Sequence, residues 1–306
     1  MASTPAVMNK EAARTAPRAA LRASMLRSPS TQSAAPLAPL GVQRVQFGSA
    51  PVDSVTMRQA TEWLQGVLTA PRSTPHLIMG PNAYLVTLAQ RDPRFAEALA
   101  HASLCLPDGM SVVWGSRLLG RPIPERVPGG EFMEQMCRVA AETGRSVYFL
   151  GGLPGAAEQA AEVLATRYPG LVVAGTDCPR PGFNQDPLAL AMVLARIRAA
   201  APDLLCVALG APMQEIWMLD HCRDLPIGAA LSVGAALDTQ AGLRQRAPTW
   251  THAIGAEWLY RLAMEPRRLW RRYLIGNARF GAILLKEWGR ERTRRATENL
   301  LRPRPI

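Results

Sequence analysis

Short apolar runs alternate with longer helical patterns through most of the chain. Each run ends at a turn containing glycine or proline, and a stretch with helical periodicity follows. Short apolar strands that alternate with helices are typical of a parallel sheet covered on both faces. We therefore predict an α/β fold: a Rossmann-like, mainly parallel sheet with helices on both faces. The strands are expected at residues 45–48, 76–79, 103–106, 146–150, 171–174, 204–209 and 227–233.

The same pattern predicts helices between these strands. Thr56 is expected to cap the first helix, because a threonine hydroxyl can accept a hydrogen bond from a backbone N–H of the first turn. In sheets of this kind, ligands bind beyond the carboxyl ends of the strands. Since the turns rich in glycine and proline follow those ends, we expect the functional site there. The helices are expected at residues 56–68, up to about 90, up to 168, 188–200, from about 213, and 256–289.

We predict three regions along the chain. Residues 1–40 are rich in alanine, proline and serine and poor in aromatic residues, which is typical of a disordered basic arm. Residues 41–255 form the α/β body. Residues 256–306 mix apolar side chains with many arginines, which is typical of a basic amphipathic appendage at a membrane interface. The alternative is that these apolar side chains simply pack on the body.

The net charge of +11 is concentrated at the two ends. Residues 1–40 carry a net +4, residues 258–306 carry +9, and the stretch between them carries −2. Basic ends of this kind suit an anionic surface, such as a membrane leaflet or nucleic acid. The five cysteines show no CxxC pair or zinc-ligand spacing, so we read them as small buried residues in a reducing compartment.

Two turns are candidates for binding a phosphate or a sugar. Gly151 and Gly152 stand between a strand and a helix, where backbone N–H groups can approach a phosphate, although such a turn can be purely structural. Gly210 and Pro212 precede Gln214, whose amide can bind a sugar hydroxyl or a pyrophosphate oxygen. The alternative for this second turn is ordinary helix N-terminal chemistry.

Asp108 is the candidate catalytic residue. It follows a strand, between Pro107 and Gly109, where a carboxylate can act as general base toward an acceptor hydroxyl. The alternative is an Asp-Gly turn that only caps the next helix.

Arg261, Arg268 and Arg271 can share one helix face, and guanidinium groups suit diphosphate oxygens, although a solvated basic face is the alternative. Pro266 lies within this spacing and can break the helix. The histidines lack metal-ligand spacing and no DxD pair occurs, so we predict neither a metal nor another cofactor.

Taken in order, eight sequence blocks resemble the WecG/TagA/CpsF family of bacterial glycosyltransferases. The resemblance spans roughly residues 43–280. The blocks are 80–83 (GPNA), 107–110 (PDGM), 120–127 (GRPIPERV), 149–152 (FLGG), 208–215 (ALGAPMQE), 233–238 (VGAALD), 246–248 (RAP) and 257–268 (EWLYRLAMEPRR).

The resemblance implies an inverting, metal-independent transfer from a UDP-sugar to an undecaprenyl-diphosphate-linked sugar. It also implies a peripheral protein on the cytoplasmic face of the membrane, in exopolysaccharide, capsule or teichoic-acid-type biosynthesis. No nucleic-acid partner is implied, and a homo-oligomer stays open. The family's base falls on Asp108, and its other site residues fall on Asn82, Arg126, Gln214, Asp238, Arg261, Arg268 and Arg271.

This chain departs from the family at three points. Gly80 stands where a threonine is usual, Met213 where a lysine is usual, and residues 236–238 (ALD) replace an aromatic residue followed by aspartate. These departures concern the identity of donor and acceptor more than the type of reaction. We therefore name no donor sugar from the sequence.

Two other functions compete with glycosyl transfer. A nicotinamide-dependent oxidoreductase would need an acidic residue after the strand that follows the glycine turn, and Asp177 is the candidate. A non-enzymatic adaptor for membrane or nucleic acid would rest on the basic ends alone.

Overall fold

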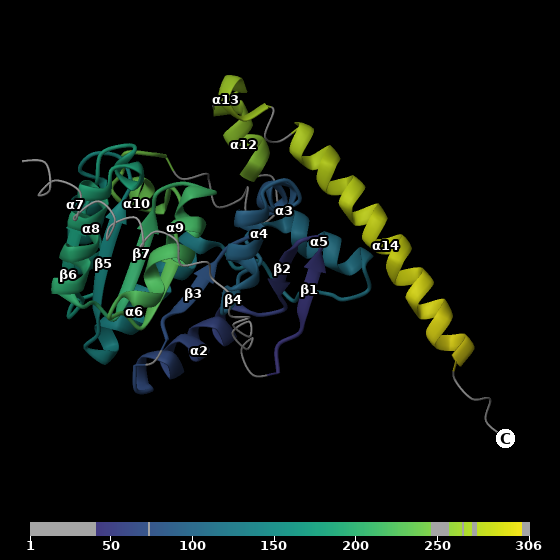
Figure 1. Ribbon diagram of the computed structural model, residues 1–306, viewed down its shortest axis with the longest axis horizontal. Helices are drawn as coiled ribbons and strands as arrows, with labels where there is room; N and C mark the ends of the chain where they lie inside the picture. Colours follow the sequence, from purple (N-terminus) through teal and green to yellow (C-terminus); the bar gives the residue numbers. More distant parts are fainter. Residues whose placement is uncertain (1–40, 73, 246–256, 265, 271–273, 302–306) are drawn as a thin grey trace, which may run out of the picture. The chain divides into compact units, whose positions relative to one another are not determined.

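The computed structural model describes residues 41–72, 74–245, 257–264, 266–270 and 274–301. A six-stranded sheet forms its centre, with the strand order β4-β3-β8-β7-β5-β6 (Figure 1). Every neighbouring pair in this sheet is parallel, which confirms the predicted fold class. The strands are β3 (His76–Met79), β4 (Leu104–Cys105), β5 (Ser146–Gly151), β6 (Val172–Asp177), β7 (Leu204–Ala208) and β8 (Ala229–Ser232).

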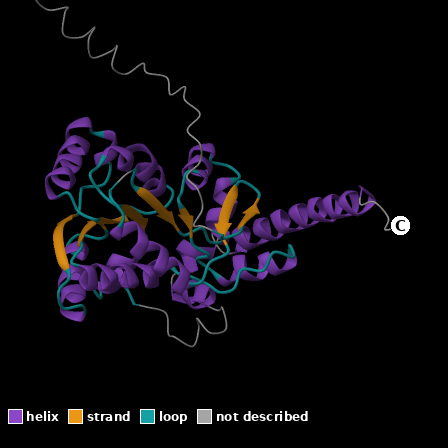
Figure 2. Cartoon of the chain, turned by 90° about the horizontal axis from the view of Figure 1, so that it is seen from below, coloured by secondary structure: helices purple, strands orange, loops and turns teal. Residues whose placement is uncertain are grey.

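Helices cover both faces of the sheet (Figure 2). Successive side chains of a strand point to opposite faces, so Phe149 joins one core cluster while Tyr148 and Leu150 join the other. One face carries α2 (Met57–Thr69), α6 (Gly129–Thr143), α7 (Ala156–Arg167) and α10 (Ala236–Gln240). The other carries α3 (Ala83–Ala89), α4 (Pro93–Ala100), α5 (Met110–Leu118), α8 (Pro187–Ala200) and α9 (Met213–His221). Two short 3-10 turns are η1 (Phe183–Gln185) and η2 (Cys222–Asp224).

The helix starts follow from local capping chemistry. Thr56 caps α2 as predicted, in a capping box where its hydroxyl accepts the Gln59 N–H and the Gln59 side chain accepts the Thr56 N–H. Asn82 caps α3 by accepting the Leu85 N–H. Asp186 caps α8, which begins with a proline at its first position.

An antiparallel hairpin of β1 (Arg44–Phe47) and β2 (Ala50–Asp53) precedes the sheet, and only its first strand was predicted. The β2 pattern is weak in the sequence because it contains Pro51 and ends in an aspartate. Asp53 is fully buried, pairs with Arg44 at 2.7 Å, and accepts the Cys105 N–H at 2.7 Å. This aspartate therefore fastens the hairpin to β4.

Among the residues that the structure describes after the body lie the helices α12 (Glu257–Met264), α13 (Pro266–Trp270) and α14 (Gly276–Leu301). Pro266 is the first residue of α13, as expected where a proline interrupts a helical pattern. Phe280 of α14 is buried, and its ring centroid lies 5.9 Å from that of Phe47. Ile283 and Leu284 pack on the same core cluster. Part of the apolar surface of α14 therefore packs on the body.

Other apolar side chains of this C-terminal part stay exposed. Those in the helices are Leu259, Met264, Trp270, Leu285 and Trp288, and Leu274 and Ile275 directly precede α14.

Across the residues described, no helix has the length and apolar character that a membrane span needs. All five cysteines are free thiols; Cys178 is half-buried and the other four are buried.

Candidate active site

The turns that follow β3, β4, β5, β7 and β8 all leave the carboxyl edge of the sheet. The strand order divides the predicted site residues into two groups along that edge. Asn82 and Asp108 follow the neighbouring strands β3 and β4. The others lie at or after the ends of β5, β7 and β8, which are also neighbours: Gly151, Gly152, Gly210, Pro212, Gln214 and Asp238.

Asp108 lies in the turn between β4 and α5, half-buried against the turn after β3. A Cβ atom added to Gly80 would lie 3.2 Å from the Asp108 Cβ and 3.7 Å from its Oδ2. A Cβ added to Gly109 would lie 3.5 Å from the Asn82 Cβ. The two turns therefore pack closely against each other, and the lack of a side chain at position 80 allows Asp108 to lie this near.

A backbone hydrogen bond brings the loop that contains Arg126 next to Asp108. The Val127 N–H donates to the Pro107 carbonyl oxygen at 3.0 Å. These two residues are the direct sequence neighbours of Arg126 and Asp108. The Arg126 side chain is only 14% exposed and pairs with Glu131 of α6 at 3.4 Å. The structure thus brings Asp108, Asn82 and Arg126 to one end of the edge.

The glycine turn after β5 lies against the end of β7. Gly151 and Gly152 have φ angles of 98° and 87°, a left-handed conformation that favours glycine. A Cβ at Gly151 would lie 2.5 Å from the Ala208 carbonyl oxygen, which the Gly152 N–H binds at 2.9 Å. The Ala156 N–H donates to the Leu153 carbonyl oxygen at 2.8 Å, but no side chain caps the N-terminus of α7. The next N–H groups of its first turn can therefore serve an anion.

Asp238 holds this turn in place. It is 5% exposed, and its Oδ1 accepts the Leu153 N–H at 2.8 Å. Its Oδ2 pairs with Arg244 at 3.0 Å. The carboxylate therefore supports the glycine turn through Leu153, a contact between residues 85 positions apart that local sequence patterns do not reveal.

Gln214 and Glu215 form a buried polar pair at the start of α9, 4% and 1% exposed. The Gln214 Nε2 donates to the Glu215 Oε1 at 2.7 Å, and the Gln214 Oε1 accepts the Gly234 N–H at 3.2 Å. Burial raises the pKa of Glu215 above its ordinary value, which favours the neutral acid. Its Oε2 has no hydrogen-bond partner, and an unpaired buried polar atom costs about 1–3 kcal/mol.

Several predicted features lie outside what the structure describes. Arg261 belongs to α12 and Arg268 to α13, but their side chains are outside the described atoms. Arg271 and the block 246–248 lie outside the described residues altogether. The roles of these arginines stay predictions.

The oxidoreductase alternative loses its candidate acid. Asp177 ends β6, and its Oδ2 accepts from the Arg196 Nε at 2.8 Å and from a second Arg196 nitrogen at 2.6 Å. Its side chain is 12% exposed. The Asp177 carboxylate therefore pairs with Arg196 of α8, which leaves it poorly placed to bind the ribose of a nicotinamide cofactor.

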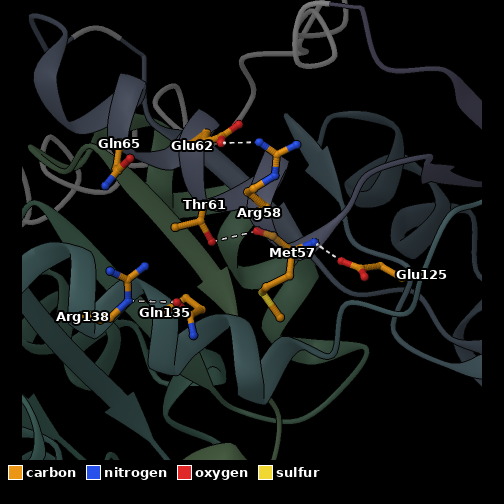
Figure 3. Close-up of a pocket in the computed structure, with 8 residues that line it drawn as sticks. All are labelled: Met57, Arg58, Thr61, Glu62, Gln65, Glu125, Gln135 and Arg138. Carbon is orange, nitrogen blue, oxygen red and sulfur yellow. Dashed lines mark hydrogen bonds and ion pairs between the residues drawn. The ribbon is translucent and has the colours of Figure 1, made fainter. Parts of the chain in front are cut away.

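A groove of about 490 Å³ runs between α2 and α6, and none of the predicted site residues lines it (Figure 3). The Glu125 Oε1 accepts the Met57 N–H here at 2.6 Å, and Arg58 pairs with Glu62. Since its charged groups are engaged within the protein, we place the candidate site at the strand ends instead. The groove is lined by Met57, Arg58, Thr61, Glu62, Gln65, Glu125, Gln135 and Arg138.

Comparison with known proteins decides the family. Residues 45–294 match the model of the glycosyl transferase WecG/TagA/CpsF family. The chain belongs to this family. It is therefore a glycosyltransferase, as the sequence blocks predicted, and neither an oxidoreductase nor a non-enzymatic adaptor.

The chain is also similar to many individual proteins, two of which follow. A protein of Bacillus spizizenii is 31% identical over 208 residues, covering 66% of this chain and 78% of the relative. One of Staphylococcus aureus is 31% identical over 220 residues, covering 72% and 84%. Both are named N-acetylglucosaminyldiphosphoundecaprenol N-acetyl-beta-D-mannosaminyltransferase.

Proposed function

We propose that this glycosyltransferase moves a sugar from a UDP-sugar to an undecaprenyl-diphosphate-linked acceptor, with inversion at the anomeric carbon. The observation that carries the proposal is the placement of Asp108 and the glycine turn after β5 on one edge of the sheet. A base and an anion-binding turn on the same edge are what a transfer from a nucleotide-sugar requires. The relatives' names support the lipid-diphosphate acceptor.

The turns after β5, β7 and β8 form the part of the active site that binds the UDP-sugar donor, which we call the donor half. N–H groups at the start of α7, directly after the glycine turn, bind the diphosphate of UDP, helped by the positive end of the helix dipole. Asp238 holds the turn after β5, and Gln214 connects the turn after β7 to the turn after β8. Gly210 allows the β7 exit to turn with a φ of 79°. Pro212 then serves as the N-cap of α9.

Asp108 acts as general base in the acceptor half. Its carboxylate removes the proton from an acceptor hydroxyl as that oxygen attacks the anomeric carbon of the donor sugar. The bond from the anomeric carbon to the diphosphate breaks, and its electron pair leaves on the phosphate oxygen. The products are the extended lipid-linked saccharide, UDP, and a proton held by Asp108. Asn82 and Arg126 bind the acceptor beside this carboxylate.

Arg261, Arg268 and Arg271 bind the acceptor diphosphate. A guanidinium group donates in a fixed fork that matches phosphate oxygens, and it stays charged throughout the physiological pH range. The three residues follow the body in the segment that also carries the exposed apolar side chains of α12 and α13. Their placement in that segment suits an acceptor presented by a membrane.

The C-terminal helices dock on the cytoplasmic face of the membrane. Residues 258–306 carry +9, and their exposed tryptophans Trp270 and Trp288 suit the interface between lipid head groups and acyl chains. A basic residue near an anionic leaflet contributes about 1 kcal/mol, weakened by salt. The packed face of α14 fixes the helix to the body, so its outer face is presented in one orientation.

A transfer assay tests the proposed function. A panel of UDP-sugars is offered with N-acetylglucosaminyldiphosphoundecaprenol in vesicles, and product is detected by mass spectrometry. We expect one UDP-sugar to give a lipid product heavier by one sugar, together with free UDP. Absence of product with every UDP-sugar would contradict the donor class or this acceptor, and separate UDP-binding measurements distinguish the two.

A further inference from the structure

The hydrogen bonds of Gln214 fix the direction of its side-chain amide. Its Oε1 accepts the Gly234 N–H in the turn after β8, and its backbone N–H donates to the Gly210 carbonyl oxygen at 2.9 Å in the turn after β7. One residue therefore contacts two of the turns that form the donor half, one through its backbone and the other through its side chain. If the amide rotated by half a turn, an NH₂ group would face the Gly234 N–H, and two donors would oppose each other.

Glu215 prevents that rotation. Its Oε1 accepts from the Gln214 Nε2 at 2.7 Å, so the nitrogen end of the amide must face Glu215 and the oxygen end must face Gly234. The Glu215 carboxyl also lies near the Ser232 hydroxyl, which acts to lower its pKa against the larger effect of burial. Ser232 is 6% exposed and is the last residue of β8. The carboxyl group thus lies between the first turn of α9 and the end of a central strand.

We propose that Glu215 is a positioning residue for nucleotide binding, which acts through Gln214 to hold the turn after β8. This inference rests on the proposed function, since it assigns the donor half to a nucleotide. Glu215 does not need to touch the ligand for this role. It needs an acceptor atom toward Gln214 and enough length to reach Ser232, both of which glutamine also has.

Four variants separate this role from simple packing. Glu215→Gln keeps the shape and the acceptor atom, whereas Glu215→Leu keeps bulk but removes the acceptor. Gln214→Leu removes the hydrogen bond between the side chain and the Gly234 N–H. The double variant Gln214→Leu with Glu215→Leu completes a double-mutant cycle. The readouts are the Kd for UDP by calorimetry and hydrogen exchange at the Gly234 amide in the protein without ligand.

We expect Glu215→Gln to bind UDP within about threefold of the unchanged protein, and Glu215→Leu to weaken binding about tenfold or more. Because both residues act through the hydrogen bond to the Gly234 N–H, the double variant should be no weaker than Gln214→Leu alone. Exchange at Gly234 should accelerate in both leucine variants and not in Glu215→Gln. If Glu215→Leu does not fold, Glu215→Asp takes its place, because its shorter side chain cannot reach both partners.

Additive losses in the cycle, or normal UDP binding by Glu215→Leu with protected Gly234, would overturn the positioning role. Failure of the unchanged protein to bind UDP would instead contradict the donor class of the proposed function. In that event hydrogen exchange at Gly234 still decides whether Glu215 holds the turn. Slow exchange in Glu215→Leu would then reject the inference on its own.

Discussion

The Asp238 carboxylate accepts the Leu153 N–H at 2.8 Å and so ties α10 to the glycine turn after β5. Replacing Asp238 by alanine leaves this N–H without its charged partner, and hydrogen bonds to charged groups contribute about 1.5–3 kcal/mol. We expect the Kd for UDP to rise about tenfold or more in calorimetry. Asp177→Ala is the matched control, because Asp177 is also a mostly buried carboxylate that pairs with an arginine. Equal losses in both variants would show that the Asp238 effect is not specific to the glycine turn.

Position 80 sets the space beside Asp108. In Gly80→Ala the new Cβ would lie 3.2 Å from the Asp108 Cβ, close enough to shift the carboxylate by a few tenths of an ångström. Since general-base catalysis depends on such positioning, we expect kcat to fall about three- to tenfold while the Kd for UDP is unchanged. Gly66→Ala is the control, because no atom lies within 4 Å of a Cβ at this position of α2. An unchanged kcat in Gly80→Ala would show that Asp108 tolerates the contact.

Gly115 allows α14 to approach α5 closely. A Cβ at this position would lie 2.8 Å from a methyl carbon of Leu284 and 3.2 Å from the Phe47 ring. Gly115→Ala should therefore loosen α14 at a cost of about 1–3 kcal/mol, measured as faster hydrogen exchange along α14. Gly289→Ala, with nothing within 4 Å of its Cβ, should leave exchange unchanged. Unchanged exchange in Gly115→Ala would mean that α14 does not depend on this contact.

The outer face of α14 provides a test of membrane docking. Leu285 and Trp288 are 66% and 37% exposed, so serine at both positions should not disturb the packed face. We expect co-sedimentation with vesicles of anionic lipid to fall about tenfold. The control replaces Leu188 and Met192 of α8 by serine, because these are exposed too and have similar spacing. If both pairs reduce sedimentation equally, apolar exposure alone explains binding and α14 has no special role.

The pH dependence of stability should report the buried acid of α9. Burial raises the pKa of Glu215 from 4.5, so the folded protein holds this proton more tightly than the unfolded chain does. Its contribution to the free energy of unfolding is therefore lost as pH rises from about 4.5 through the raised pKa. Glu215→Gln should remove this slope, measured by urea unfolding from pH 4 to pH 8.

Two histidines also titrate in that interval. Burial lowers the pKa of His76 and His221, so their contribution to stability is lost as pH falls below about 6.5. They are present in both proteins, and the difference between Glu215→Gln and the unchanged protein cancels them. A difference that does not vary with pH would contradict the neutral state of Glu215.

Local patterns predicted the sheet because its strands are continuous apolar runs. The β3 strand matches residue for residue, and α2 begins after the predicted cap Thr56. The strand β2 escaped prediction, because Asp53 is buried through its contacts with Arg44 and the Cys105 N–H, and an acidic residue does not indicate a buried strand. Sequence blocks indicated Gln214 and Asp238, but not that each contacts a backbone turn distant in sequence. Those contacts depend on strand order, which no single segment encodes.

The kinetics of Asp108→Asn test the proposed role of Asp108 as general base most directly. Asparagine keeps the shape of the side chain but cannot take the proton, so we expect transfer to fall about 10²–10⁴-fold. UDP binding by calorimetry and thermal stability should stay within about twofold and a few degrees of the unchanged protein. Near-normal turnover by the folded variant would contradict the assignment of Asp108 as the base.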